Sequence, residues 1–262
     1  MNYETIVVEQ QDGVKKITLN RAENANALNM KMGEELMKVA IDCHESENTR
    51  AVLLTGKGPM FSAGGDLRSF SEKGDRLSAE LVELTTYLHA AVSRFARMDA
   101  PLVIAVNGMA AGAGMSLAIC GDYVMAAESA RFTMAYTKAG LSPDGSSTYY
   151  LPRLIGVRRA KELMITNRIL SATEALNWGI VNKICQDEQL INEAEKMAQM
   201  LAAGPTLSYG VVKELVMHSM TESLESQMEN ETQAIAKMAR SSDAKEGISA
   251  FLEKRNPQFQ GR

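Results

Sequence analysis

The sequence has few of the residues that build disulfide frameworks and metal sites. Its 262 residues include three cysteines and three histidines. The cysteines lie far from one another along the chain, and so do the histidines. An odd number of cysteines without a CxxC pair indicates neither a disulfide framework nor a zinc knuckle. The histidines likewise lack the spacing of metal ligands. We therefore expect a protein without a metal site, folded in a reducing compartment.

The chain also lacks long apolar runs and any strong excess of one charge. No apolar segment reaches the roughly 18 residues of a membrane span, and the formal net charge is only −4. This balance argues against a membrane protein and against a general nucleic-acid binder. The N-terminus opens on a strand-like segment instead of a signal peptide. We expect a cytoplasmic protein with neither a membrane nor a nucleic-acid partner.

Strand-like and helical patterns alternate along the first part of the chain. Apolar or alternating runs predict strands at residues 4–9, 14–20, 51–55, 102–106, 123–126 and 131–134. Apolar residues at helical spacing predict helices at residues 29–45, 79–97 and 113–120. Strands that alternate with helices imply parallel pairing through right-handed crossovers. The pattern predicts an α/β fold.

The C-terminal part of the sequence is helical. Gly204-Pro205 is the strongest boundary signal, and it divides a main body of residues 1–203 from a C-terminal region of residues 204–262. Before it, a short strand is expected near residues 180–184. After it, helices are expected at residues 206–219, 222–240 and 243–254, the last one beginning at Asp243. Their apolar faces exceed what one helical flap can cover alone, which predicts a homo-oligomer.

Two glycine-rich turns carry the strongest functional signal. Residues 61–67 (FSAGGDL) follow the predicted strand 51–55, and residues 107–114 (NGMAAGAG) follow the predicted strand 102–106. Each turn opens a helix, whose first N–H groups have no internal partner and lie at the positive end of the helix dipole. Small residues let a ligand approach such a backbone closely. Two converging turns can hold a charge that appears only in a transition state, which predicts chemistry through an oxyanion.

Several other residues allow both a structural and a functional interpretation when each is considered alone. Gly112 and Gly114 make a poor dinucleotide fingerprint, because the third position is Leu117. Asp144 lies between a proline and a glycine, where an aspartate is commonly a turn residue satisfied by its own backbone. His89 lies beside the inward face of helix 79–97 and reads first as an ordinary half-buried histidine. A role in a site is the alternative for both residues.

Taken together and in order, the motifs resemble the crotonase family, the enoyl-CoA hydratase and isomerase group. The similarity covers essentially the whole chain. It rests on the glycine turns and on residues 26–29 (NALN), 105–108 (AVNG), 173–181 (TEALNWGIV) and 246–255 (EGISAFLEKR). The resemblance implies a crotonase-like spiral of ββα units with a C-terminal helical trimerisation region, assembled as a trimer or a dimer of trimers.

The resemblance also assigns roles to residues of this sequence. The backbone N–H groups of Gly65 and Ala113 correspond to the oxyanion hole that polarises an acyl-CoA thioester carbonyl. Residues at positions where the family binds its substrate and CoA are Asn26, Ala27, Leu28, Ala63, Gly64, Asp66 and Leu67. Phe251 and Lys254 match positions that reach CoA, often in a neighbouring subunit. CoA arrives as part of the substrate, and no further cofactor is implied.

The departures from the family pattern point to the reaction. Family hydratases carry two glutamates at the positions held here by Ser116 and Tyr136, and neither of these is a carboxylate base. Asp144 instead matches the single acid of the family's isomerases. The pattern is most similar to the isomerase of ring-epoxidised phenylacetyl-CoA and to Δ3,Δ2-enoyl-CoA isomerases. It predicts an acyl-CoA isomerase that works through a thioester enolate, with Asp144 as acid and base.

Three other functions remain as alternatives. Residues 149–182 resemble the family's 4-chlorobenzoyl-CoA dehalogenase, in which an aspartate at the position of Asp144 attacks the ring and a histidine at that of His89 activates water. That enzyme has a tryptophan where this chain has Tyr136 and a phenylalanine where it has Gly65, which weakens the match. An enoyl-CoA hydratase and an acyl-CoA binder without turnover are the other two.

Overall fold

The computed structural model describes residues 3–262, and within them the chain forms two β-sheets. The larger sheet has the order β1 (Ile6–Gln11), β2 (Val14–Leu19), β3 (Ala51–Gly56), β5 (Leu102–Val106), β7 (Tyr123–Ala127) and β10 (Lys183–Cys185). The smaller sheet has the order β4 (Met60–Ser62), β6 (Met109–Ala111), β8 (Arg131–Thr133) and β9 (Leu170–Ser171). The β1–β2 and β8–β9 pairs are antiparallel, and the other pairs are parallel, as the α/β pattern predicts.

Consecutive strand pairs link the two sheets. A strand of the larger sheet is followed by a short strand of the smaller sheet and then by a helix: β3–β4–α2 (Leu67–Ser71) and β5–β6–α4 (Ala113–Ala118), with β7–β8 continuing the series. The connections are tight. A Cβ on Gly108 would lie 2.0 Å from the carbonyl oxygen of Pro59, so only glycine fits there. The repeated arrangement confirms the spiral of ββα units that the resemblance implies.

This arrangement corrects one expectation about the glycine turns. We expected them directly after the strands of the larger sheet, but β4 and β6 intervene and belong to the smaller sheet. Three-residue strands carry too few residues to show an alternating pattern. Three of the eight residues of the expected second turn form strand β6.

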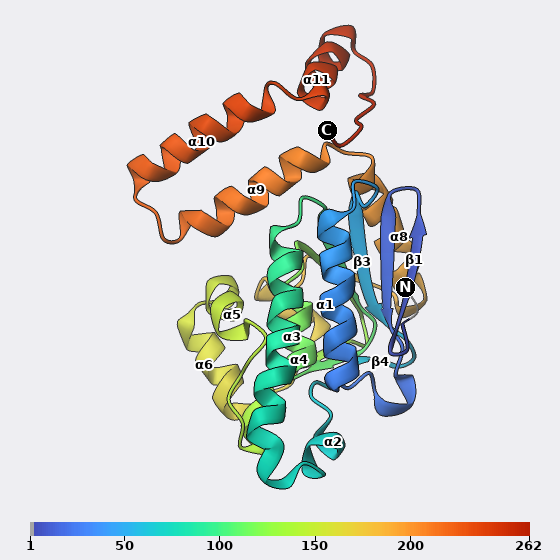
Figure 1. The fold of residues 1–262 in the computed structure, drawn as a ribbon, viewed down its shortest axis with the longest axis vertical. Helices are drawn as coiled ribbons and strands as arrows, with labels where there is room; N and C mark the ends of the chain where they lie inside the picture. Colours follow the sequence, from blue (N-terminus) through green and yellow to red (C-terminus); the bar gives the residue numbers. More distant parts are fainter. Residues whose placement is uncertain (1–2) are drawn as a thin grey trace.

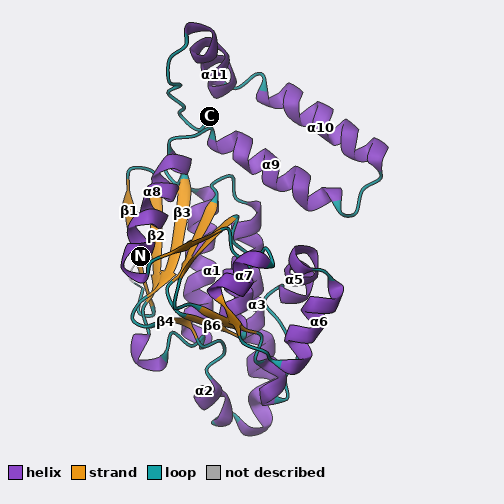
Figure 2. Cartoon of the chain, turned by 180° about the vertical axis from the view of Figure 1, so that it is seen from behind, coloured by secondary structure: helices purple, strands orange, loops and turns teal. Residues whose placement is uncertain are grey.

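Long helices cover the larger sheet. Helices α1 (Met30–Glu45) and α3 (Leu77–Arg97) pack side by side on one face, and α8 (Leu190–Ala202) lies on the other (Figures 1 and 2). Asn29 caps α1, since its side chain accepts a hydrogen bond from the Met32 amide. The predicted inward face of α1 is buried. In α3 the helical spacing predicts an inward face of Leu81, Leu84, Leu88, Val92 and Phe95, and all of them are buried except Leu81, which is half-buried.

The C-terminal helices form an arm that projects from the body (Figure 1). The expected boundary at Gly204-Pro205 falls between α8 and α9 (Thr206–Ser219), and α10 (Leu224–Met238) and α11 (Ser242–Glu253) follow. Lys213 ties α9 to the body through an ion pair with Asp122 of 2.8 Å. The separation into two domains stays a prediction. In the described part of the chain, no helix combines the length and apolarity that a membrane crossing needs.

The start of the last helix differs from the expectation. Ser241 is the cap of α11, because its hydroxyl accepts a hydrogen bond from the Ala244 amide. Asp243 lies inside the helix and is buried, and its carboxylate accepts hydrogen bonds from the amides of Gln260 and Gly261. The carboxylate therefore holds the C-terminal segment against α11, a role that the local sequence does not reveal.

Candidate active site

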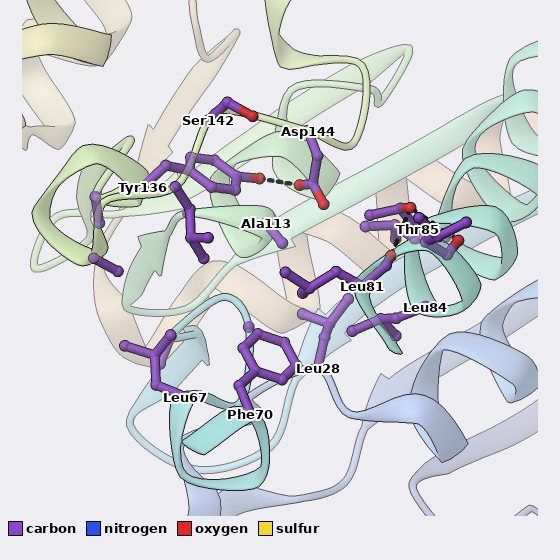
Figure 3. Close-up of a pocket in the computed structure, with 18 of the residues that line it drawn as sticks. Leu28, Leu67, Phe70, Leu81, Leu84, Thr85, Ala113, Tyr136, Ser142 and Asp144 are labelled. Carbon is purple, nitrogen blue, oxygen red and sulfur yellow. Dashed lines mark hydrogen bonds between the residues drawn. The ribbon is translucent and has the colours of Figure 1, made fainter. Parts of the chain in front are cut away.

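A cavity of about 360 Å³ lies where the two glycine turns meet (Figure 3). The turns reach it because they follow β4 and β6, which pair in parallel, and neighbouring parallel strands end at the same edge of a sheet. Helices α2 and α3 and residues 135–144 complete the walls. Apolar lining residues include Leu28, Leu67, Phe70, Leu81, Leu84, Leu88 and Leu141.

The two turns touch through their glycines. A Cβ on Gly64 would lie 2.7 Å from the carbonyl oxygen of Ala111 and 3.2 Å from the amide nitrogen of Ala113. Gly64 also has a φ of +93°, which favours glycine. Gly65 and Ala113 both line the cavity, and within residues 3–262 neither backbone N–H donates a hydrogen bond. Two unpaired amides thus border one apolar cavity, an arrangement that can bind an oxyanion.

Asp144 completes the polar part of this cavity (Figure 3). Its carboxylate accepts a hydrogen bond from the Tyr136 hydroxyl, whose oxygen lies 2.9 Å from Oγ of the buried Ser116 on α4. Burial, together with the charge of Asp144, raises the pKa of Tyr136 far above its ordinary value. Tyr136 therefore stays a neutral phenol that donates a hydrogen bond to the carboxylate.

The chain around Asp144 is held at several points. The Asp144 carbonyl accepts hydrogen bonds from the hydroxyl and the amide of Ser147, at 2.9 and 3.2 Å. The Gly145 amide donates to Nε2 of His89, at 3.1 Å. His89 was expected to be half-buried, but it is exposed, because it lies beside the buried face of α3 and not on it. It lines a second cavity of about 590 Å³, which shares only Asp144 with the first.

Comparisons with known proteins show the family of the chain. A profile described as "Enoyl-CoA hydratase/isomerase" matches residues 9–262. The chain belongs to the enoyl-CoA hydratase/isomerase family. It is 38% identical to the 1,2-epoxyphenylacetyl-CoA isomerase of Escherichia coli K12, over 99% of each chain. It is 34% identical to a 4-chlorobenzoyl coenzyme A dehalogenase of an Arthrobacter species, over 88% of this chain and 84% of that one.

Solved structures of the family share the fold. The enoyl-CoA hydratase of Bacillus anthracis superposes with a TM-score of 0.92, at 33% identity, over 99% of this chain and all of that one. The expected crotonase-like fold is thereby confirmed, and acyl-CoA chemistry is consistent with the family.

Some of the positions that we expected to bind substrate line the cavity, and others do not. Leu28, Ala63 and Leu67 line the cavity. Ala27, Gly64 and Asp66 are not among the lining residues. The Ala27 carbonyl and the Asp66 carboxylate are both bonded to one arginine, Arg21. Asp66 also caps α2. Asn26 is fully buried and bonds to the Arg21 amide and to the Lys57 and Met60 carbonyls, so its side chain organises the turns and does not reach the cavity.

Phe251 and Lys254 lie at the far end of the molecule. They belong to α11 and its C-terminal cap, in the arm, whereas the cavity lies beside α2 and α3 at the opposite end (Figure 1). Within one chain they do not meet the cavity. Their expected contact with CoA requires a neighbouring subunit and stays a prediction.

The sequence did not identify several cavity residues. Phe70, Val82 and Thr85 line the cavity, and Leu81 does so instead of packing in the core. The helical spacing of α3 predicts a single apolar face. The sequence does not show which residues of that face pack in the core and which line a cavity. The sequence also did not predict the hydrogen bond from Tyr136 to Asp144, because that bond depends on the conformation of residues 136–144.

Proposed function

We propose that the protein is an acyl-CoA isomerase that moves a double bond, or rearranges a ring epoxide, through a thioester enolate. The observation that carries this proposal is that the amides of Gly65 and Ala113 share one apolar cavity with Asp144. Among the residues that line the cavity, Asp144 is the single carboxylate. One carboxylate suffices when a proton leaves one carbon and returns to another on the same face.

The mechanism assigns one step to each group. The thioester oxygen accepts hydrogen bonds from the amides of Gly65 and Ala113, which stabilise the negative charge of the enolate. Asp144 removes the proton from the carbon next to the thioester and, once protonated, delivers it farther along the acyl chain. Tyr136 holds one carboxylate oxygen, and the other makes no hydrogen bond within residues 3–262, so it is free to accept the proton.

The same geometry supports isomerisation over hydration. Hydration through a pair of carboxylates needs a second acid beside the substrate, and Ser116 and Tyr136 occupy the two positions concerned. Because the pKa of Tyr136 is raised, its hydroxyl cannot serve as a base near neutral pH. The proposed reaction uses main-chain amides and one carboxylate, with CoA as part of the substrate and no further cofactor.

Dehalogenation is the second candidate, favoured by the similarity to the Arthrobacter dehalogenase. Two observations weigh against it. The lone pair of His89 Nε2 already accepts the Gly145 amide, so it is not free to activate water. A Cβ on Gly65 would lie 2.7 Å from the Phe70 ring, which fills the space that an aromatic side chain at position 65 would need.

A panel of thioesters tests the proposal. We expect 3-hexenoyl-CoA to give the absorbance of a conjugated thioester, and an arylacetyl-derived epoxide or enoyl thioester to rearrange faster if the E. coli relative shares its substrate with this chain. Chloride release from 4-chlorobenzoyl-CoA, without isomerisation of any thioester, favours the dehalogenase instead. Binding of acyl-CoA with no turnover of any substrate favours a non-catalytic binder.

We also propose that the arm mediates assembly into a trimer or a dimer of trimers. Its helices expose large apolar side chains to solvent, and Ile235, Ile248, Phe251 and Leu252 are 72%, 64%, 82% and 74% exposed. Such a surface is typical of a protein–protein contact. The cytoplasmic location stays a prediction.

A further inference from the structure

We propose that His89 is a positioning residue that fixes the peptide unit between Asp144 and Gly145 and thereby aims the Asp144 carboxylate. This inference rests on the proposed function, because it gives His89 a role in the reaction that Asp144 performs. It assigns no proton transfer to His89.

Both polar ends of this one peptide unit are bonded. Its carbonyl, that of Asp144, accepts from Ser147, and its N–H, that of Gly145, donates to His89 Nε2 at 3.1 Å. A peptide plane that is held at both ends cannot rotate without losing a hydrogen bond. The Cα atom of Asp144 belongs to this peptide plane, so fixing the plane restricts the direction of the Asp144 side chain.

The position of Gly145 makes the bond from His89 necessary. Gly145 is buried at a φ of +59°, and a Cβ there would lie 2.8 Å from Cβ of Ser116 and 3.5 Å from Cδ2 of Leu88. The loop therefore presses against α3 and α4 with no room for a side chain. A buried amide without an acceptor is unfavourable, and among the described residues His89 is the acceptor of the Gly145 amide.

The placement of His89 fits a positioning role and not a role in acid–base chemistry. To accept the Gly145 amide, the imidazole must be neutral and carry its proton on Nδ1. His89 lines the second cavity and not the one that holds the oxyanion amides. It therefore acts on the reaction through the backbone of the Asp144 loop and does not meet the reacting atoms.

Two substitutions at position 89 test the inference. His89→Leu removes the acceptor at similar volume, whereas His89→Gln keeps an acceptor oxygen near the place of Nε2. With 3-hexenoyl-CoA, we expect His89→Leu to lower kcat about 10- to 100-fold with KM within about twofold, as for a misplaced catalytic group. We expect His89→Gln to restore kcat to within about threefold of the wild type.

Amide hydrogen exchange supplies a readout that does not depend on turnover. The Gly145 amide should exchange faster in His89→Leu and stay protected in the wild type and in His89→Gln. His218→Leu is the matched control, because His218 also lines the second cavity but makes no side-chain bond to the loop. We expect it to leave kcat and the protection of Gly145 unchanged.

The outcomes that overturn the inference are distinct. If His89→Gln is as inactive as His89→Leu while Gly145 stays protected, the imidazole itself takes part in the chemistry. If His89→Leu keeps full kcat, or Gly145 stays protected in it, the hydrogen bond has no positioning role. A wild-type protein that isomerises no thioester contradicts the proposed function, and the exchange experiment then still reports on the bond.

Discussion

At the scale of single residues, the roles of Ser116, Tyr136 and Asp144 depend on one another. In family hydratases the first two positions hold acids, and here they form a neutral chain of hydroxyl groups that ends on the Asp144 carboxylate. Asp144 is the single carboxylate among the residues that line the cavity, and in the proposed reaction it accepts the proton from the substrate. Its place between Pro143 and Gly145 by itself suggests a turn residue, and only the resemblance to family isomerases indicated a catalytic role. The bond to Tyr136 gives the carboxylate a defined direction.

Asp144→Asn tests this role with little change in shape. The asparagine can still accept the Tyr136 hydroxyl, but it cannot take up a proton. We expect kcat to fall at least about 100-fold, with the thermal midpoint and the affinity for a product acyl-CoA unchanged. Stopped-flow absorbance measures kcat, thermal denaturation measures the midpoint, and calorimetric titration measures the affinity. Turnover close to that of the wild type removes Asp144 from the mechanism.

At the scale of elements, the contact between the two glycine turns places the amides of Gly65 and Ala113, the proposed oxyanion hole, at one cavity. Strands β4 and β6 bring the turns to one edge, and Gly64 allows their backbones to touch. Neither turn has this property by itself, because each contributes one amide. The pair therefore behaves as a single structural unit whose spacing is sensitive to any added atom.

Gly64→Ala should disrupt that unit. The new methyl group meets the Ala111 carbonyl at 2.7 Å and the Ala113 amide at 3.2 Å, at a φ of +93°. We expect a loss of about 1–3 kcal/mol in the free energy of unfolding and a fall in kcat of about 100-fold or more, as for a lost oxyanion donor. Urea denaturation and steady-state kinetics measure the two effects.

Gly156→Ala is the matched control for backbone strain. Gly156 has a φ of +80°, but a Cβ there meets nothing within 4 Å. It should lose stability to a similar degree and keep its kcat. Equal losses of kcat in the two variants contradict a specific role for the contact between the turns.

At the scale of the whole molecule, the arm α9–α11 projects from the body (Figure 1). Many of its large apolar side chains are exposed in one chain. The arm also carries Phe251 and Lys254, which cannot reach the cavity of their own chain. Both facts are explained if the arm of one subunit packs against another. Assembly and completion of the CoA site are then one event.

Phe251→Asp tests assembly through the arm. Placing a charge on an exposed apolar contact should shift the protein toward monomer, because burial of an unpaired carboxylate is unfavourable. Light scattering after size exclusion measures the mass, and circular dichroism confirms the fold. Phe251→Leu keeps the apolar contact and should assemble normally. An unchanged mass in the aspartate variant excludes this contact from the interface.

The buried thiols predict how stability depends on pH. Burial raises the pKa of Cys43 and of Cys120 to about 12, against an ordinary value of 9.0. Above pH 9 the unfolded chain releases these protons while the native protein keeps them, so the free energy of unfolding falls as pH rises toward 12. We expect a loss of roughly 1 kcal/mol per thiol at pH 10. Urea denaturation at pH 8 and pH 10 should show a smaller loss in a Cys43→Ala, Cys120→Ala variant, and an equal loss contradicts this origin.

The amino-acid sequence by itself determined the features that depend on local geometry. Helical spacing placed α1 and α3, apolar runs placed β3 and β5, and the glycine turns indicated an oxyanion. Such patterns report which face of an element is buried, because the periods of helices and strands are fixed by the backbone. The motifs, taken in order, also indicated the family.

Only the tertiary structure decided which segments meet. The pairing of β4 with β6 brought Gly65 and Ala113 to one cavity, the fold of the loop joined Tyr136 to Asp144, and α3 placed His89 against Gly145. These contacts join residues that are distant or irregular in the chain. Their distances depend on strand register and on the packing of whole elements, and no local period carries that information.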